Sequence, residues 1–211
     1  KEIALETKEI FVPLAHKLGM AKLKWELEDL SLKCLDLRSF NSIKKKIETS
    51  ARLNEDILNN AIRPIKKELK SYKIKSDIFG RYKSISSIHR KILKSNKKFE
   101  DIYDLYAIRI VVDKIEECYL ALGIIHNIYP PLQDRFKDFI ATPKTNGYQS
   151  IHTTVLTKDN RLTEVQIRTK EMDNTAEVGV AAHWLYKGEN ELGEFDSQVS
   201  WLRDLLSIIN T

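Results

Sequence analysis

Cysteine is scarce in this sequence, and its two cysteines stand apart. Cys34 and Cys118 belong to no CxxC motif and have no histidine at metal-ligand spacing. A disulfide framework or a structural zinc site uses more cysteines at closer spacing. The sequence therefore argues against both and predicts two buried thiols.

Long apolar runs are also missing. No stretch approaches the roughly 20 apolar residues that span a bilayer. The first twenty residues, KEIALETKEIFVPLAHKLGM, lack the order of a signal peptide. Hydrophobic residues make up 42% and charged residues 31% of the 211 positions, which fits a globular chain of one or two domains. We therefore expect a cytoplasmic protein with no membrane segment.

Positive charge is only slightly in excess of negative charge. The chain has 35 basic and 30 acidic residues, a formal charge of +5. This balance permits phosphate ligands without requiring them. The placement of the charges is more informative than their sum.

Residues 1–71 have a helical pattern throughout. Two apolar series recur at steps of about three and four residues: Leu23, Leu27, Leu30, Cys34 and Leu37, then Ile43, Ile47, Ile57, Ile62, Ile65 and Leu69. Gly19 is predicted to end the first helix, and Pro64 to kink or restart the later one. Nothing in this half indicates catalysis.

After residue 72 the sequence alternates between strand and helix patterns. Strands are expected over 105–112, 148–156 and 162–169, the last two joined near Asp159-Asn160, and helices over 116–129, 170–187 and about 196–209. There is no internal repeat. The pattern predicts an α+β fold with a helical lead-in, divided into 1–71, 72–190 and a C-terminal helix in 191–211.

A basic segment, GRYKSISSIHRKI, covers residues 80–92. On a helix, Lys83, Ser87 and Lys91 would fall on one stripe, with Arg81 at the entrance, where backbone N–H groups also point outward. This arrangement suits a triphosphate. Taken alone, such a stripe is more often a solvated basic face.

Two carboxylates form a second candidate. Asp104 precedes an apolar strand, and Glu164 alternates with Gln166 and Arg168 on one face of another strand. Carboxylates from neighbouring strands are a usual way to hold Mg²⁺ against substrate phosphates. The alternatives are a cap or turn role for Asp104 and an exposed strand position for Glu164.

The third candidate is the polar stretch RFKDFIATPKTNGYQSIHTTV, residues 135–155. Asn146-Gly147 is a turn signal, and Tyr148 directly after it could stack on a nucleotide base. The alternatives are a strand tyrosine covering the edge of the core and, for His152, a hydrogen-bonded strand histidine.

The number of residues in the hairpin loop decides whether the side chains of His152 and Glu164 face the same side of the sheet. Directly opposed residues of an antiparallel pair face the same side, so the two side chains share a face if, for example, Thr154 lies opposite Glu164. The connecting loop must then hold an odd number of residues. A regular two-residue Asp159-Asn160 turn without a bulge would separate them.

Together these stretches resemble the RelA/SpoT alarmone synthetases. The resemblance rests on five ordered blocks within residues 80–187: GRYKSISSIHRK, YDLYAIR, RFKDFIATPKTNGYQSIHTTV, EVQIRT and AEVGVAAHWLYK. It implies a nucleotidyltransferase palm-like mixed sheet flanked by helices. It also implies a GTP/GDP pyrophosphokinase that moves pyrophosphate from ATP to the 3′-hydroxyl of GDP or GTP, giving (p)ppGpp and AMP. The competing interpretation is a non-catalytic nucleotide- or RNA-binding sensor.

The resemblance also implies roles for individual residues. Asp104 and Glu164 would hold Mg²⁺, with Glu164 a second ligand or the base for the 3′-hydroxyl. The ATP side would be formed by Arg81, Lys83, Ser87 and Lys91, and the guanine-nucleotide side by Lys137, Asn146, Tyr148 and His152.

The RFKD form of the third block is similar to that of long bifunctional synthetase/hydrolase members. The segment EIFVPLAHKLGMAKLKWELEDL is similar to the end of their hydrolase domain. The resemblance thus implies a fragment whose hydrolase metal motifs lie upstream of Lys1 and whose regulatory domains, with any ribosome association, lie outside this sequence. Asp173 stands where the family often has histidine, and no role is assigned to it.

Overall fold

The computed structural model describes residues 1–95, 99 and 106–179. Its helices are α1 (Glu2–Glu6), the π-helical η1 (Thr7–Phe11), α2 (Val12–Lys17), α3 (Ala21–Leu35), α4 (Leu37–Ser71), α5 (Ile85–Ser95), α6 (Ile115–Ile128), the 3₁₀ turn η3 (Gln133–Arg135) and α7 (Lys170–Val178). Its strands are β1 (Ser76–Tyr82), β2 (Tyr106–Val112), β3 (Lys137–Asp138), β4 (Ile151–Leu156) and β5 (Leu162–Thr169). Among the described helices, none is both long and apolar enough to cross a bilayer.

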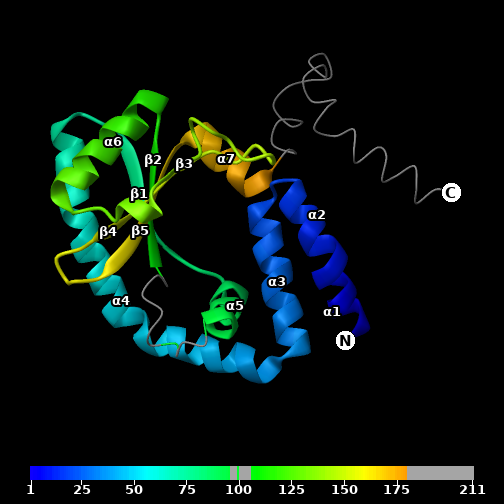
Figure 1. Cartoon of the computed structure of the whole chain (residues 1–211). Helices are drawn as coiled ribbons and strands as arrows, with labels where there is room; N and C mark the ends of the chain where they lie inside the picture. Colours follow the sequence, from blue (N-terminus) through cyan, green and yellow to red (C-terminus); the bar gives the residue numbers. More distant parts are fainter. Residues whose placement is uncertain (96–98, 100–105, 180–211) are drawn as a thin grey trace, which may run out of the picture.

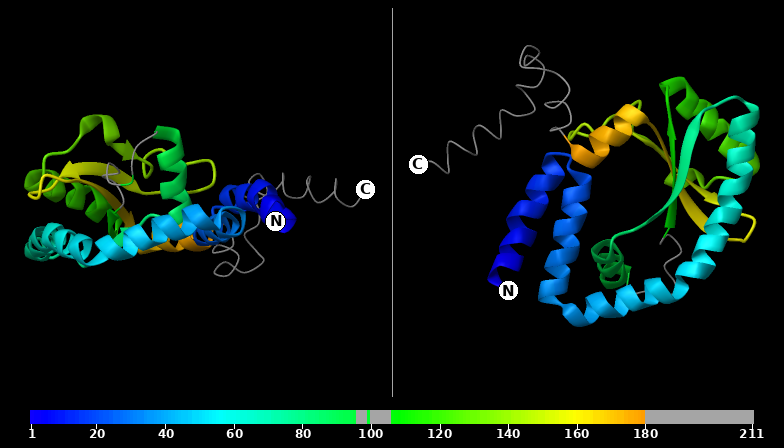
Figure 2. Two further views of the ribbon diagram at one scale, coloured as in Figure 1. Left: turned by 90° about the horizontal axis from the view of Figure 1, so that it is seen from below. Right: turned by 180° about the vertical axis from the view of Figure 1, so that it is seen from behind.

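The five strands form one mixed sheet in the order β1-β2-β5-β4-β3. The β2–β5 pair is parallel, and the other three pairs are antiparallel. Helices α4 and α6 lie along the sheet, while α3 and the preceding helices stand apart from it (Figures 1 and 2). The expected mixed sheet flanked by helices, with a helical lead-in, is confirmed.

One face of the sheet packs against α4 and α6. Successive strand residues point to opposite faces, so each strand contributes alternate apolar side chains to this core. Its fully buried members include Ile108, Ile110 and Val112 of β2, Ile151 and Val155 of β4, Val165 and Ile167 of β5, Ile65 and Leu69 of α4, and Cys118 and Ile125 of α6. The end of the helical segment and the sheet thus share one core.

Helix α4 runs without a break through Pro64, so of the two predicted outcomes, a kink or a restart, the restart is excluded. A proline inside a helix removes one backbone hydrogen bond. The residues after it, Ile65 and Leu69, are fully buried against the sheet, and this packing keeps the last turns in place. Gly80 of β1 lets α4 approach closely, because a Cβ at that position would collide with Leu58.

Gly19 ends the first helical stretch as predicted. It has φ of +71°, and the amides of Gly19 and Met20 donate to the carbonyls of His16 and Ala15 at 3.2 and 2.9 Å. This pair of hydrogen bonds is a Schellman motif, which glycine favours because it adopts positive φ without a steric penalty.

The apolar series predicted for α3 does not form a buried stripe. Leu23, Leu30 and Leu37 are 39%, 57% and 52% exposed, and Cys34 is exposed while Cys118 is buried. The prediction of two buried thiols is therefore wrong for Cys34. The reason is that the buried side chains of α3 are Glu28 and Ser31, so the helix turns a polar side inward.

The parity prediction for the hairpin is confirmed. Thr154 lies opposite Glu164 and Leu156 opposite Leu162, so the connecting loop is 157–161, an odd length. His152 and Glu164 therefore share a face. Strand β4 begins only at Ile151, which places Tyr148 in the preceding loop and not in the strand as predicted.

The C-terminal predictions are only partly covered by the structure. Helix α7 begins after Thr169, whose side chain accepts a hydrogen bond from the amide of Met172. It is described up to Val178. The rest of the expected 170–187 helix and the expected helix near 196–209 lie outside the described residues.

Candidate functional site

A row of polar side chains crosses the second face of the sheet. The strand register places Arg109 beside Gln166, Gln166 beside His152, and His152 beside Lys137. These residues alternate with the core residues of the same strands, so the pleat directs them away from the core. The sheet therefore presents donors and positive charge on the face opposite α4 and α6.

Glu164 lies next to this row and is held by three neighbours. Its carboxylate is 3.2 Å from His152 Nδ1 and 3.4 Å from Lys83 Nζ, and it accepts a 3.1 Å hydrogen bond from Gln166 Nε2. Burial by itself would raise the pKa of the carboxyl, but the contact with His152 and the charge of Lys83 outweigh it and lower the pKa well below its usual range. Glu164 is thus a carboxylate at neutral pH.

Tyr148 is positioned by the loop before β4. The turn Lys144–Gly147 closes with a 2.9 Å backbone hydrogen bond, and Gly147 has φ of +74°. The side-chain oxygen of Asn146 accepts from the amide of Tyr148 at 3.3 Å, and the Tyr148 hydroxyl lies 2.8 Å from His152 Nε2. Burial raises the pKa of the Tyr148 phenol, so the ring is fixed and uncharged.

A cation lies against this ring. The ammonium of Lys144 is 5.0 Å from the centroid of Tyr148 and 4.5 Å from that of Phe139. Contacts of this kind are favourable because the face of an aromatic ring is electron-rich. The loop therefore places a positive charge beside the aromatic ring.

Two arginines lie buried under the site. Arg109 and Arg168 are 5% and 1% exposed. Arg109 Nη1 is 2.7 Å from Glu177 and 3.3 Å from Asp173, and Arg168 Nη2 is 2.7 Å from Asp173 but out of line for a hydrogen bond. Among the described residues, the buried Nε atoms of both arginines have no hydrogen-bond partner.

Helix α3 contributes to the site from the helical half of the chain. The indole of Trp25 lies over the guanidinium of Arg81, with 3.5 Å between the guanidinium carbon and the ring centroid. Burial lowers the pKa of Arg81 to about 10, so it stays charged at neutral pH. The side chain of Asn146 donates to the carbonyl of His16 at 3.1 Å.

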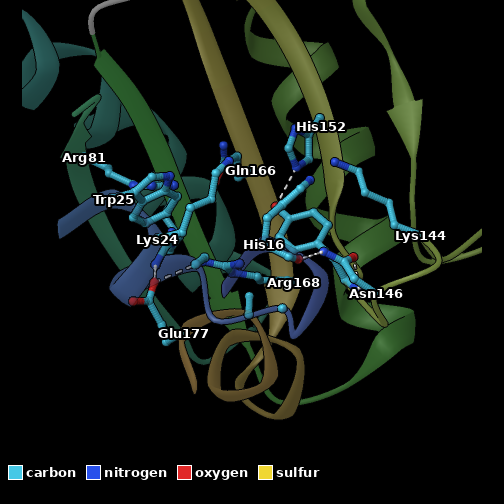
Figure 3. A pocket seen from close by; sticks show the side chains of 15 residues that line it. His16, Lys24, Trp25, Arg81, Lys144, Asn146, His152, Gln166, Arg168 and Glu177 are labelled. Atoms are coloured by element: carbon cyan, nitrogen blue, oxygen red, sulfur yellow. Dashed lines mark hydrogen bonds and ion pairs between the residues drawn. The ribbon is translucent and has the colours of Figure 1, made fainter. Parts of the chain in front are cut away.

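These groups surround a cavity of about 200 Å³ (Figure 3). Basic side chains line it from both halves of the molecule: His16 and Lys24 from the N-terminal helices, and Arg81, Arg109, Lys144, His152 and Arg168 from the sheet and its loops. Tyr148, Trp25 and Glu177 also line it. A concave site with convergent cations and aromatic rings suits an anionic ligand that has a planar part.

The structure brings together most, but not all, of the residues singled out in the sequence. Arg81, Asn146, Tyr148 and His152 line the cavity, and Glu164 contacts His152 beside it. Lys137 is an exposed residue opposite His152. Asp104 lies outside the described residues.

The basic segment departs from the predicted single stripe. Arg81 belongs to β1, Lys83 to the link that follows, and only Ser87 and Lys91 to α5. The helical spacing was extended across a strand–helix boundary, where it does not apply. Lys83 instead reaches the sheet, where it pairs with Glu164.

Several cavity residues were missed by the sequence analysis. Arg109 carried a usable signal, because it is a charged residue inside an apolar strand run. Arg168 was placed on the polar face of its strand, beside Gln166, but was given no role. Trp25 and His16 carried no signal, since they come from helices far away in the sequence. Asp173 was given no role, and nothing in the sequence indicated that it pairs with both buried arginines.

Comparisons with known proteins show which family the chain belongs to. The family model described as the region found in RelA / SpoT proteins matches residues 80–191. A guanosine-3′,5′-bis(diphosphate) 3′-pyrophosphohydrolase of Spiroplasma citri is 48% identical over 89% of this chain and 25% of its own length. A GTP pyrophosphokinase of Escherichia coli K12 is 41% identical over 97% of this chain and 28% of its own length. The chain thus spans about a quarter of these relatives.

A solved structure shares the fold. The small alarmone synthetase 2 of Bacillus subtilis matches with a TM-score of 0.51 and 23% identity, over 79% of this chain and 95% of that one. At this identity the likeness supports the architecture alone. With the family model covering more than half of its residues, the chain belongs to the RelA/SpoT family.

Proposed function

We propose that this chain is an alarmone synthetase, which transfers pyrophosphate from ATP to the 3′-hydroxyl of GDP or GTP and releases AMP. The observation that carries the proposal is Glu164. It is a charged carboxylate held between His152 and Lys83 at the edge of a largely basic cavity. A protein that only binds polyanions gains nothing from a negative charge there, whereas phosphoryl transfer needs a metal ligand or a base.

The guanine nucleotide is assigned to the loop and strand around Tyr148. The ring of Tyr148 is fixed by its hydroxyl contact with His152 and offers a face for base stacking. Asn146 lies beside it, and Lys137 is adjacent to His152 on β3 and β4, which suits a donor to a phosphate oxygen. His152 would donate to phosphate by giving up its contact with Glu164 or with Tyr148. This half of the site orients the 3′-hydroxyl.

ATP is assigned to the segment from β1 to α5. Arg81 lines the cavity, Lys83 stands next to Glu164, and Ser87 and Lys91 share one face of α5. Cations in this arrangement offset charge on the transferred and leaving phosphates.

The transfer makes one bond and breaks one. The 3′-oxygen attacks the β-phosphorus of ATP, the bond from that phosphorus to the α,β-bridging oxygen breaks, and AMP leaves with the electron pair. Glu164 receives the hydroxyl proton. Its lowered pKa makes it a weak base while Lys83 is paired with it; engagement of Lys83 by a phosphate of ATP removes that partner and raises the basicity of Glu164.

Mg²⁺ is the metal that fits this chemistry. Its preferred ligands are carboxylate oxygens, phosphates and water, and it does not need an all-protein cage. Among the described residues, no group of three or more acidic, histidine or cysteine side chains forms such a cage. Asp104 is the residue we assign to it, with Glu164 as a second ligand in the alternative to its role as the base, and the ion would neutralise phosphate charge.

The proposal also states which residues form the synthetase domain and in which compartment the enzyme works. We assign the synthetase to residues 72–190, with 1–71 as the preceding helical segment and 191–211 as a C-terminal helix. We also place the enzyme in the cytoplasm, with its nucleotide substrates, and assign any ribosome association to parts of the relatives that this chain does not cover.

The test is a transfer assay with the 211-residue chain. Incubation with labelled ATP, GDP or GTP and Mg²⁺, followed by nucleotide separation, is expected to yield (p)ppGpp and AMP in equal amounts. Binding of both nucleotides without product would make the chain a binding module instead. Failure to bind either nucleotide would contradict the proposal.

A further inference from the structure

Helix α3 makes two separate contacts with the segment assigned to ATP. Trp25 stacks on the guanidinium of Arg81 at 3.5 Å. One turn later, the carboxylate of Asp29 accepts hydrogen bonds from the backbone amides of Ser86 at 2.7 Å and Ile85 at 3.3 Å. Because residues four apart lie on the same face of a helix, one face of α3 delivers both groups.

These two groups resemble the two ends of a nucleotide. A guanidinium stacks on a planar aromatic ring, whether that ring is an indole or a purine. The N-terminal amides of a helix bind an oxyanion, whether it is a carboxylate or a phosphate. Trp25 and Asp29 therefore use the same recognition features of Arg81 and α5 that ATP needs.

The attachment of α3 to α5 is polar. Glu28 is 9% exposed; it accepts a 2.7 Å hydrogen bond from Arg90 and lies 3.5 Å from the hydroxyl of Ser86. The described buried side chains of α3 are polar, and its leucines at 23 and 30 face solvent. Water can replace polar contacts of this kind at small net cost, so α3 can leave α5 without exposing an apolar core.

The size of the cavity indicates that α3 stands too close for substrates. The cavity encloses about 200 Å³, whereas sites for small molecules usually enclose roughly 300–1,000 Å³. Two nucleotides must fit for the transfer. Trp25 lies directly in the wall next to Arg81 (Figure 3), so moving α3 away is one change that enlarges the site on the side of Arg81.

We propose that α3 is a built-in competitor of ATP, with Trp25 in the place of the base and Asp29 in the place of a phosphate. The inference rests on the proposed function, because it concerns the regulation of that site. ATP binds only to molecules in which α3 has withdrawn from Arg81 and α5. Its apparent affinity is therefore reduced by the fraction of molecules in that state.

The first experiment measures ATP affinity by calorimetry with the complete 211-residue chain. The probe is α,β-methylene-ATP, which cannot be cleaved at the transferred bond. Trp25→Ala and Asp29→Asn are each expected to tighten its binding by about 3- to 30-fold, the range that loss of one such stacking contact allows. Trp25→Phe keeps an aromatic face and is expected to stay near the wild type.

The matched control is Leu30→Ala, on the same helix but 57% exposed; it should leave the affinity unchanged. Unchanged or weaker binding by Trp25→Ala would overturn the inference and make Trp25 a supporting wall of the site. If the wild type also forms product, the proposed function survives that result. If neither the wild type nor any variant binds the analogue, both the inference about α3 and the proposed function are contradicted.

The second experiment keeps Trp25, so its outcome does not depend on whether proteins substituted at Trp25 fold. Replacing Trp184 and Trp201, which lie outside the described residues, by phenylalanine leaves Trp25 as the single tryptophan. Saturation with the analogue is expected to shift its emission to longer wavelength as the indole leaves Arg81 for water. An unchanged spectrum at a saturation verified by calorimetry would overturn the inference.

Discussion

Both faces of the sheet have deeply buried residues, but the two faces differ in what covers them. Ile110 and Ile167 on one face are fully buried, and Arg109 and Arg168 on the other are only 5% and 1% exposed. The apolar face meets α4 and α6, whereas the charged face meets carboxylates from α7. Burial therefore does not separate a structural face from a functional one; the chemistry of the covering groups does.

Removing the carboxylate of Glu164 should have the largest effect and should change only the charged face. Glu164→Gln is expected to lower the rate of transfer by about 10²- to 10⁴-fold, the usual contribution of a positioned acid–base group. Its unfolding transition should stay cooperative, which circular dichroism would verify. A folded Glu164→Gln protein with near wild-type turnover would remove Glu164 from the chemistry.

The matching change on the apolar face should affect stability instead. Ile167→Ala leaves a cavity in a fully buried position and is expected to lower the free energy of unfolding by about 2–5 kcal/mol, measured by urea titration. Leu120→Ala, at a position 45% exposed on α6, is the control and should stay within about 0.5 kcal/mol. Equal losses in both variants would contradict the location of the core.

A smaller effect is expected at the edge of the charged face, where Tyr148 lies in a loop. Base–aromatic stacking is worth roughly 1–3 kcal/mol, so Tyr148→Ala should weaken GTP or GDP binding by one to two orders of magnitude while ATP affinity stays nearly constant. Tyr148→Phe keeps the face of the ring and should retain most of the affinity. Equal weakening of both nucleotides would indicate a disturbed loop and not a lost stacking partner.

The smallest expected effect is the dependence of stability on pH. The pKa of Glu164 is lower in the folded chain than in the unfolded one, so its charge stabilises the fold above the ordinary carboxyl pKa of about 4.3. This contribution is lost as the pH falls from there through the folded pKa. The difference in unfolding free energy between wild type and Glu164→Gln should be constant from pH 7 to about 5 and should shrink below that. A difference that does not change down to pH 3 would mean that the carboxyl keeps an ordinary pKa.

The charged face was partly predictable because strand periodicity is local. The alternation of Glu164, Gln166 and Arg168 with apolar residues placed them together, and the parity of the hairpin added His152. Both inferences need only the two-residue period and one turn. The position of Lys83 was wrong because a helical period was carried into a strand.

The contribution of α3 could not be predicted, because it depends on packing between distant segments. The apolar spacing in α3 indicated a buried leucine stripe, yet Glu28 is buried and Leu30 faces solvent. Hydrophobic periodicity shows that a helix has two sides, but not which side its neighbours take. Trp25 reaches Arg81 only through that arrangement.

Helix α4 is one continuous link between α5 and the sheet, and it bends on the way (Figures 1 and 2). Its 35 residues follow a path of about 50 Å at the rise of an α-helix. Ile65 and Leu69 fasten one part of it to the sheet, and Ile43 fastens another to Ile88 of α5. Because one helix carries both attachments, α4 connects α5, which holds Ser87 and Lys91, to the sheet that holds Glu164.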